Sequence, residues 1–349
     1  MVLPHPTGRR RATRVRALPR AATRRAGTRT ATLRHPAAGP PAGRTETSHR
    51  PAVHRRAART WALLRLTRPW FWPLGWAAAY AGSVLATRTW LPPTAALPRS
   101  LVALVVLGPL LWTAVLTVND RHDLPSDRRN PRKATAPLVI GLLTEADLLR
   151  WHVGATVAAL ALTVTAIGPA FALGTALVLL LGWAYSTPPV RLKTRPGLDV
   201  AANALAVGVL APLAGWSLHR PVTSYPVLVA VLGLLLVAAL YLPTTVLDVD
   251  ADTAAGDTTA AVRWGTRRCR RAGLALWAAA TGVWLVCCHL GVLVRRDSWT
   301  LQDLWASVLI AGYAVAVRRP SIPRLAGVCL LFAVPAGDFL TWWIAAGPA

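Results

Sequence analysis

The sequence predicts an all-α membrane protein, a polytopic bundle of about nine transmembrane helices. Hydrophobic residues make up 54% of the 349 residues and charged residues only 15%, which is too apolar for a soluble protein of this length. A helix needs roughly 20 mainly apolar residues to cross the hydrocarbon core of a bilayer. Runs of that kind cover residues 70–87, 100–118, 146–167, 169–186, 200–217, 225–247, 272–294, 302–317 and 325–347.

The formal net charge of +25 is concentrated near the N-terminus. Residues 1–60 contain 15 Arg and one acidic residue, Glu46. Because this composition offers almost no large apolar side chains to bury, we predict a disordered Arg-rich tail over 1–60 and a transmembrane domain over 61–349. The tail either favours anionic lipid, at about 1 kcal/mol per Arg near the surface, or reflects an upstream start codon. Nucleic acid is not an expected partner, since no aromatic interleaving accompanies the charge.

The loops between the predicted spans differ in their basic residues. With nine spans, one set of loops carries 16 Lys and Arg and the other set carries 5. Cytoplasmic loops are enriched in Lys and Arg, so the first set and the N-terminal tail are predicted to be cytoplasmic. The three most polar loops, at 119–135, 185–199 and 248–271, all belong to this side. A single active site at the cytoplasmic mouth of the bundle requires this arrangement.

Two short segments hold 7 of the 14 acidic residues. In the first, Asn119, Asp123 and Asp127 are spaced i, i+4, i+8, which places an amide and two carboxylates along one face of a helix. In the second, Asp248 and Asp252 repeat the i, i+4 spacing. Helix capping and surface solvation would explain one Asp at a helix end, but not two periodic clusters. The remaining acids of these segments are off that face: Asp120, Asp250 and Asp257.

The chemistry of magnesium fits this pattern. Mg²⁺ takes oxygen ligands in octahedral geometry and is usually held by one or two carboxylates together with substrate phosphates. Two facing clusters would hold ions that bridge a diphosphate and stabilise it as a leaving group. The sequence therefore predicts Mg²⁺ as the cofactor, held by Asn119, Asp123, Asp127, Asp248 and Asp252.

The two lysines of the chain, among 39 basic residues, both lie in these polar loops. Lys133 follows the first acid cluster, with Arg132 beside it, and both are candidate diphosphate contacts. Lys193 and Arg191 lie in the loop YSTPPVRLKTRPGLD, where a compact ammonium charge and a bidentate guanidinium suit a phosphate. Two lysines in two basic loops could also be chance.

Three local features complete the prediction for these loops. Tyr185 begins the middle loop, and the two prolines after it should stiffen the chain. Gly256 should let the backbone leave the helix after Asp252. Thr258 and Thr259 are expected to cap the next helix rather than take part in catalysis.

At these residues the chain resembles the UbiA superfamily of intramembrane prenyltransferases, over about residues 60–346. The first signature of that family, NxxxDxxxD, fits Asn119, Asp123 and Asp127, and the second, DxxxD, fits Asp248 and Asp252. The resemblance implies a nine-helix bundle, two Mg²⁺ ions bridging a prenyl diphosphate, and a cavity open sideways to lipid.

The loop sequences are most similar to those of the carotenoid-modifying branch of the superfamily, typified by lycopene elongases. Enzymes of that branch attach a five-carbon unit to a long apolar acceptor. The aromatic-acid branch usually reads YxxxK in the middle loop, whereas position 189 here is Pro. The loops also occur in poorly characterised relatives and in terpene cyclases of the superfamily.

The predicted function is Mg²⁺-dependent transfer of a prenyl group from a prenyl diphosphate to a lipophilic acceptor, with release of diphosphate. Lys193, Arg191 and Lys133 would assist departure of the diphosphate, and Tyr185 is the aromatic residue expected in the active site. A terpene cyclase would ionise the same donor without a second substrate. A transporter is the third alternative, but the acids follow the apolar runs rather than interrupting them. The predicted location is the cell membrane.

Overall fold

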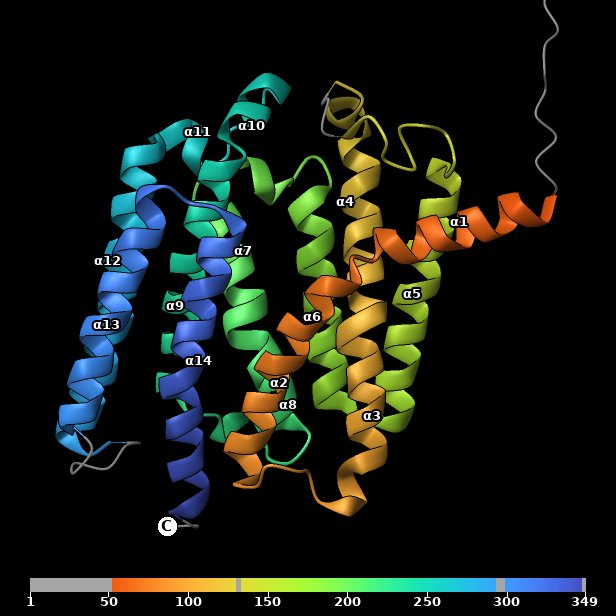
Figure 1. Cartoon of the computed structure of the whole chain (residues 1–349). Coiled ribbons are helices and arrows are strands. Elements are labelled where there is room, and N and C mark those ends of the chain that lie inside the picture. The colour runs from red at the N-terminus through yellow and green to blue at the C-terminus, as the bar shows by residue number, and fades with distance from the viewer. Residues whose placement is uncertain (1–51, 130–132, 293–298, 347–349) are drawn as a thin grey trace, which may run out of the picture. The chain divides into compact units, whose positions relative to one another are not determined.

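The computed structural model describes residues 52–129, 133–292 and 299–346, and side chains are described from residue 57, with those of 299 and 300 left out. The described residues form helices and no strand (Figure 1). The α-helices are α1 Ala52–Leu66, α2 Trp72–Thr87, α3 Leu97–Val105, α4 Leu111–Asp127, α5 Glu145–Ala166, α6 Pro169–Ser186, α7 Leu198–Asn203, α8 Ala211–Ser217, α9 Val227–Leu247, α10 Val249–Ala255, α11 Ala260–Trp264, α12 Thr266–Leu290, α13 Trp299–Arg318 and α14 Ile322–Ala345. Two π-helical segments, η3 Val106–Leu110 and η6 Ala204–Leu210, join α3 to α4 and α7 to α8.

Seven helical stretches in the described residues are long and apolar enough to cross a membrane. They are Thr94–Asp127, Glu145–Ala166, Pro169–Ser186, Leu198–Ser217, Val227–Leu247, Thr266–Leu290 and Ile322–Ala345. The prediction of an all-helical membrane protein is confirmed. The two other apolar runs of the sequence fall on α2, with 16 residues, and on α13, with 20; the count of nine spans stays a prediction.

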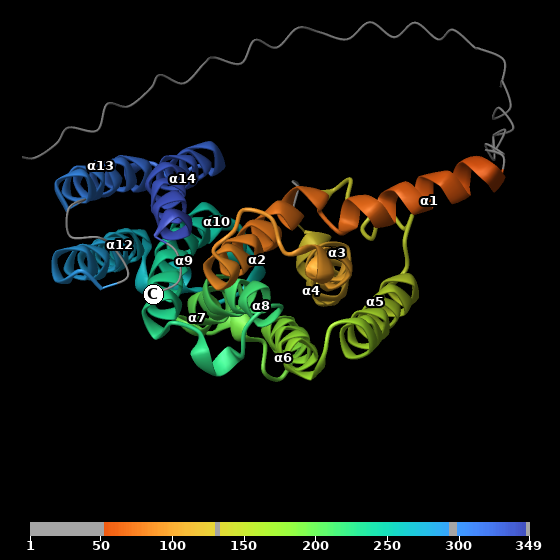
Figure 2. The same ribbon diagram turned by 90° about the horizontal axis from the view of Figure 1, so that it is seen from below.

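The long helices run up and down the bundle in chain order. Packed pairs include α2 with α8, α4 with α5 and α6, α9 with α12, and α13 with α12 and α14. Helix α4 packs on α6, α6 packs on the α7–α8 stretch, and that stretch packs on α9, so these elements follow one another across the bundle (Figure 2). The end of α4, the start of α7, and helices α10 and α11 all lie at one end of the bundle (Figure 1). The polar segments of the sequence are therefore gathered at this end, which we call the polar end.

Helices α2 and α8 approach each other through two glycines. A Cβ placed on Gly82 would lie 1.9 Å from the carbonyl oxygen of Pro212, and one placed on Gly215 would lie 1.7 Å from that of Ala79. Without a side chain at either position, the two backbones pack directly, as is typical of helix interfaces in membranes.

Prolines inside two helices leave backbone carbonyls without their usual donors, and neighbouring helices supply replacements. Pro109 lies in the π-helical η3, and the indole of Trp76 donates to the carbonyl of Leu104, five residues earlier, over 2.9 Å. Pro243 lies in α9, and the hydroxyl of Tyr313 donates to the carbonyl of Ala239, four residues earlier, over 2.6 Å. Because hydrocarbon offers no water to bond these groups, such donors stabilise the bundle.

Helix α1 begins at Ala52, before the predicted domain boundary at residue 60. Its buried side chains Ala62 and Leu66, one turn apart, pack with Leu124 and Leu148. These contacts attach the second half of α1 to the bundle, and Arg59 forms an ion pair with Asp147 at 2.7 Å. Residues 1–51 of the predicted tail lie outside the described residues.

Candidate active site

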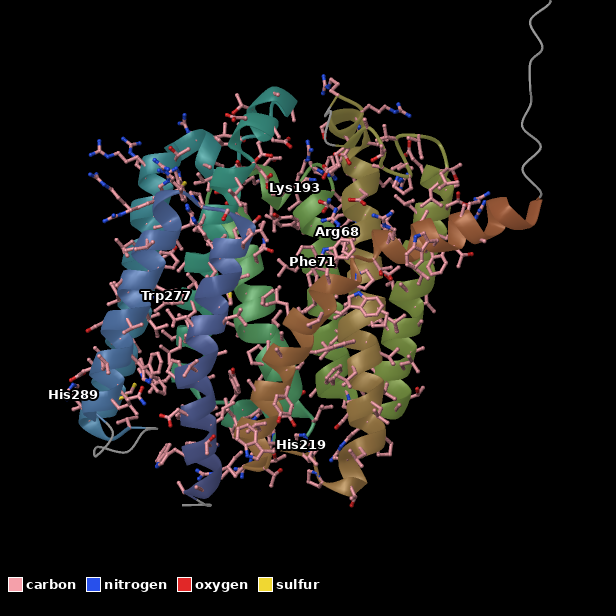
Figure 3. The ribbon with its side chains drawn as sticks, in the orientation of Figure 1. Arg68, Phe71, Lys193, His219, Trp277 and His289 are labelled. Atoms are coloured by element: carbon pink, nitrogen blue, oxygen red, sulfur yellow. The ribbon has the colours of Figure 1, made fainter. Side chains whose placement is uncertain are left out.

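A cavity of about 400 Å³ lies between α4, α6, η6 and α9 and reaches the segment around α10 and α11. Figure 3 shows Lys193 and Arg68 toward the polar end of the bundle and His219 toward the opposite end. The polar and charged residues lining this cavity come from segments far apart in the sequence: Arg68, Asn119, Asp123, Tyr185, Lys193, Asn203, Tyr241, Thr244, Thr245, Asp248, Asp252, Asp257 and Thr259. The three predicted polar loops therefore meet at one site.

The first acid motif occupies the last turns of α4. Asn119 and Asp123 both line the cavity, as their i, i+4 spacing predicts. Asp127 is the last residue of the helix and does not line it; its carboxylate instead lies 3.4 Å from the ammonium of Lys133. Each i+4 step turns about 40° around the helix, and Pro125 lies just before Asp127. Rotation around the axis thus separates the third motif residue from the first two.

The second acid motif lies at a break between two helices rather than on one continuous helix. Asp248 ends α9 and precedes α10, and the amide of Asp252 donates to its carbonyl over 2.8 Å. Both side chains line the cavity. As predicted, Gly256 ends α10 in the left-handed conformation, with φ +80°.

Burial of Asp252 raises the pKa of its carboxyl to about 6, with smaller contributions from nearby Asp248, Asp257 and Asp123. The hydroxyl of Thr259 donates to Oδ2 of Asp252 over 3.0 Å and partly offsets this. The expectation that Thr259 caps the next helix with its side chain needs correction: it precedes α11, but its hydroxyl is used by Asp252.

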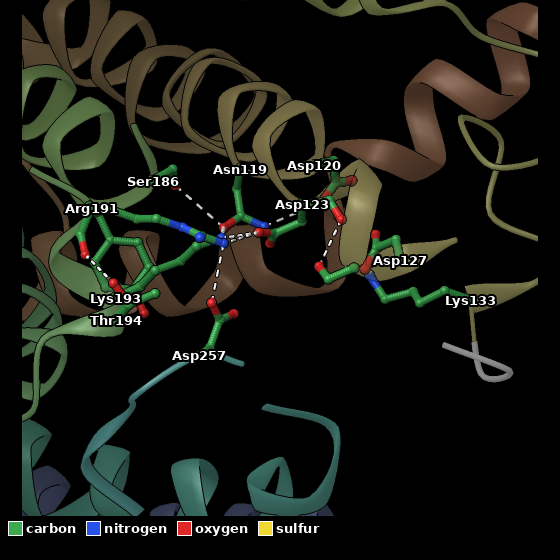
Figure 4. A network of polar contacts seen from close by, with 12 residues as sticks. Asn119, Asp120, Asp123, Asp127, Lys133, Ser186, Arg191, Lys193, Thr194 and Asp257 are labelled. Carbon is green, nitrogen blue, oxygen red and sulfur yellow. Dashed lines mark hydrogen bonds and ion pairs between the residues drawn. The ribbon is translucent and has the colours of Figure 1, made fainter. Parts of the chain in front are cut away.

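Lys193 is the cation at the centre of the site. It lies in a 3₁₀ turn, Leu192–Thr194, and is 9% exposed. Its Nζ contacts Oδ1 of Asp123 and lies 3.1 Å from Oδ1 of Asn119 (Figure 4). The hydroxyl of Ser186 donates to the same amide oxygen over 3.3 Å. Lys193 thus neutralises the acid side of the first motif directly.

Arg191, from the same segment, lies between the first acid motif and Asp257, an acid that follows the second motif. Its guanidinium lies 3.6 Å from Asp123 and 3.4 Å from Asp257 (Figure 4). The Nε atom is buried and has no hydrogen-bond partner among the described residues. The backbone of Arg191 has φ +36°, which is uncommon for a non-glycine residue. Arg132, the other predicted arginine, lies outside the described residues.

The wall between the polar end of the cavity and its interior carries a pair of tyrosines. The hydroxyls of Tyr185 and Tyr241 lie 2.6 Å apart, and Asn203 lines the cavity as well. Tyr185 was predicted, whereas Tyr241 and Asn203 were missed because each stands alone in an apolar run without a motif spacing. Arg68 was also missed; it follows α1, lines the cavity and lies 3.2 Å from Asp120.

A second cavity, of about 190 Å³, continues from the first toward the opposite end of the bundle. The two share the lining residues Trp112, Val115, Val178, Asn203 and Ala206. Most other lining residues of the second cavity are apolar, among them Phe171 and Gly174. The charged first cavity therefore leads into an apolar second cavity.

The oxygen donors of the first cavity fit a Mg²⁺ ion whose coordination shell is completed by a bound ligand. No group of three or more His, Cys, Asp or Glu in the described part of the chain is arranged to hold a metal by itself. The oxygen donors instead occupy two walls, with Asn119 and Asp123 on α4 and Asp248 and Asp252 at the α9–α10 junction. Mg²⁺ commonly binds such small carboxylate sets with phosphates and waters as the other ligands. The unpartnered Nε of Arg191 also suits an anion.

Several comparisons relate this arrangement to known proteins. A UbiA homolog from Archaeoglobus fulgidus bound to GPP and Mg²⁺ has a similar structure, with a TM-score of 0.63 and 24% sequence identity over 81% of this chain and 98% of that one. The same homolog bound to DMAPP and Mg²⁺ matches to the same extent, with a TM-score of 0.63, 24% identity and the same coverage of 81% and 98%. A digeranylgeranylglyceryl phosphate synthase has a TM-score of 0.63 and 14% identity over 82% of this chain and 99% of that one.

At these identities the solved structures establish the shared fold. No curated protein sequence matches the chain. The family model of the UbiA prenyltransferases matches residues 71–324, which is more than half of the chain and contains both acid motifs and the Lys193 segment. The chain therefore belongs to the UbiA prenyltransferase family.

Proposed function

We propose that this protein transfers a prenyl group from a prenyl diphosphate to a lipophilic acceptor and releases diphosphate, with Mg²⁺ as the cofactor. The observation that carries the proposal is the joined pair of cavities, in which acids and Lys193 lie at the polar end and apolar side chains lie beyond them. A prenyl diphosphate has the same division into a charged head and an apolar chain. The similar structures bound to GPP or DMAPP together with Mg²⁺ support the assignment.

Five residues are proposed to hold the Mg²⁺. Asn119, Asp123, Asp248 and Asp252 line the cavity, and Asp127, one turn beyond Asp123 on α4, would exchange its contact with Lys133 for the metal. Bound Mg²⁺ supplies neutralisation of the diphosphate charge, which makes it a better leaving group. The basic residues proposed to contact the diphosphate are Lys193, Arg191, Lys133 and Arg132. Lys193 and Arg191 present fixed positive charge where negative charge grows as the carbon–oxygen bond breaks.

The walls of the cavity determine what happens to the allylic cation left behind. Water would capture it, so an apolar lining that excludes water favours capture by the acceptor. The hydroxyls of Tyr185 and Tyr241 hydrogen-bond each other, which fixes both rings in the wall of the cavity. Tyr185 is proposed to shape the wall next to the reacting carbon, where its aromatic face can stabilise positive charge.

The proposed membrane arrangement has nine spans, with α2 and α13 added to the seven helical stretches of sufficient length. The polar end is proposed to face the cytoplasm. Five arginines between 263 and 271 and three more between 318 and 324 support this orientation, because α11, the start of α12 and the α13–α14 connection all lie at that end (Figure 1). Prenyl diphosphate would then enter from the cytoplasmic side.

The acceptor is proposed to be a long apolar molecule of the carotenoid class, such as lycopene. The similarity of the segment YSTPPVRLKTRPGLD to the lycopene elongase branch supports this class.

The proposal is tested with membranes containing the full chain, a panel of prenyl diphosphates and Mg²⁺, with and without lycopene, by measuring diphosphate release and product masses. We expect release to require Mg²⁺ and to be lost in Asp252→Ala. The matched control is Asp250→Ala, an exposed acid on the same helix that does not line the cavity, and it should retain release. Unchanged release in Asp252→Ala would overturn the proposal. A rearranged hydrocarbon formed without acceptor would instead identify a terpene cyclase.

A further inference from the structure

Asp199 connects two loops that carry different parts of the candidate active site. Its side chain is buried, and the residue is 1% exposed. One carboxylate oxygen, Oδ1, accepts hydrogen bonds from the amides of Gly197, at 2.8 Å, and Val200, at 2.9 Å. The other, Oδ2, accepts from the amide of Ala260, 61 residues away, at 2.9 Å. One side chain thus binds the start of α7 to the start of α11.

Each of these two loops supplies groups to the cavity. The loop before α7 carries Arg191 and Lys193, and the segment before α11 carries Asp257 and Thr259. Ala260 directly follows Thr259, whose hydroxyl donates to Asp252. Any displacement of Ala260 therefore moves the donor that orients Asp252.

Two other interactions join the same loops near the surface. The hydroxyl of Thr258 donates to the carbonyl of Thr194 over 2.5 Å, and Arg191 lies 3.4 Å from Asp257. Thr258 is exposed, whereas Asp199 is not. Because buried hydrogen bonds do not exchange with water, the Asp199 contacts are the stronger restraint on the spacing of the two loops.

The three donors around Asp199 require a carboxylate. Both oxygens accept, and Asp199 makes no ion pair within the described ranges. An amide in its place would keep one accepting oxygen but turn an NH₂ group toward an N–H. At Ala260 this would replace a hydrogen bond with a repulsive contact and leave a buried donor unsatisfied.

We propose that Asp199 is a positioning residue that holds Asp252 and Thr259 in register with Lys193, so that cation affinity of the site depends on it. This inference rests on the proposed function, because it assumes that Asp252 binds Mg²⁺. Asp199 itself does not line the cavity and contacts no reacting atom. It acts through the Ala260 amide and the loop that follows Asp252.

The test compares Asp199→Asn with Asp147→Asn in the purified full-length protein. Asp147 is the control because it is also a buried carboxylate, 7% exposed, that accepts a backbone amide, that of Thr144, at 2.9 Å. It lies in the first turn of α5, outside the cavity. Binding of Mn²⁺, a paramagnetic substitute for Mg²⁺, is measured by electron paramagnetic resonance without substrate. We expect about a 10-fold loss of Mn²⁺ affinity in Asp199→Asn, as outer residues of metal sites typically show, and wild-type affinity in Asp147→Asn.

A second readout is the Mg²⁺ dependence of diphosphate release, which should recover in Asp199→Asn at high Mg²⁺. Equal Mn²⁺ affinity in Asp199→Asn and the wild type would overturn the inference, as would an equal loss in both Asn variants. If Asp199→Asn does not fold, Ala260→Pro removes the amide that donates to Oδ2 of Asp199, at the first position of α11, where proline is compatible with a helix. Mn²⁺ affinity should fall in this variant as well, and unchanged affinity would overturn the inference. Wild-type protein that binds Mn²⁺ but releases no diphosphate would contradict the proposed function alone.

Discussion

The ammonium group of Lys193 forms an ion pair with Oδ1 of Asp123 inside the cavity. The same nitrogen lies 3.1 Å from the amide oxygen of Asn119. Both oxygens are proposed Mg²⁺ ligands, so Lys193 and the metal compete for them in the absence of substrate. Once a diphosphate is present, its oxygens offer Lys193 other acceptors. Lys193 is therefore expected to oppose metal binding but to support catalysis.

Replacing Lys193 should affect these two properties in opposite directions. Lys193→Met should bind Mn²⁺ several-fold more tightly than the wild type without substrate, since repulsion between charges about 4 Å apart is about 1 kcal/mol even in bulk water. The same variant should lose diphosphate release by at least about 100-fold, because a fixed charge at the leaving group is absent. Lys133→Met, which removes the outer cation near Asp127, should change both quantities less. Weaker metal binding in Lys193→Met would contradict this account.

Replacing the ionisable carboxylate of Asp252 should stabilise the folded state of the metal-free protein. Its folded-state pKa of about 6 lies above the ordinary value of 3.8, because burial disfavours the charged form. As pH rises from about 4 to 6 the unfolded chain loses this proton first, so the group lowers folding stability across that window and the loss persists above it. After allowance for its partial exposure, Asp252→Asn should gain about 1 kcal/mol at pH 7.5.

Thermal unfolding at a fixed scan rate in EDTA measures this effect, and a gain of about 1 kcal/mol corresponds to roughly 2 °C. The same variant should release no diphosphate, since it lacks a proposed metal ligand. Asp250→Asn serves as the control for charge alone, because Asp250 is exposed on the same helix. A drop in the unfolding temperature of Asp252→Asn would show that the ionised carboxylate of Asp252 does not destabilise the folded protein.

The tyrosine pair should behave as one energetic unit. The hydroxyls of Tyr185 and Tyr241 lie 2.6 Å apart, so removal of either leaves the other without this partner. Tyr185→Phe and Tyr241→Phe should each lower the free energy of unfolding by about 1 kcal/mol. The double variant should cost less than the sum of the two, which a double-mutant cycle detects. Additive effects would mean that the two hydroxyls do not depend on each other.

Local spacing predicted part of the site well. Asn119 and Asp123 line the cavity because i, i+4 residues share a helix face whatever surrounds the helix. Asp248 and Asp252 also line it, although the helix breaks at Asp248. That break depends on how the segment after α9 packs, which spacing alone does not encode. Asp127 lies outside the cavity lining because each i+4 step turns about 40° around the helix, so the third residue of the motif leaves the face that Asn119 occupies.

The residues missed by the sequence analysis reach the cavity from distant elements. Arg68 arrives from the turn after α1, and Tyr241 and Asn203 from the interiors of apolar runs. No spacing connects them to the acid motifs, so only the packing of α4, α6, η6 and α9 brings them together. Asp199 was also overlooked, because its importance comes from an amide 61 residues away. Long-range contacts of this kind set the shape of the site.

The apolar cavity should limit the length of the prenyl chain that the donor can carry. On α6, Tyr185 lines the charged cavity and Gly174 lines the apolar one, and residues 174–185 span roughly 16 Å along the helix axis. One five-carbon unit advances about 5 Å, from four carbon–carbon bonds of about 1.5 Å. Gly174 thus lies near the third unit from the diphosphate, and a Cβ there meets no atom within 4 Å.

Gly174→Leu should therefore fill the cavity without disturbing its walls. We expect diphosphate release from 20-carbon donors to fall at least about 10-fold, while release from 5- and 10-carbon donors stays at the wild-type level. The matched control is Gly154→Leu on α5, where a Cβ also meets nothing within 4 Å but the residue lines neither cavity. An equal loss with donors of every length would mean that the acceptor, rather than the donor chain, occupies the apolar cavity, because an acceptor is needed whatever the length of the donor.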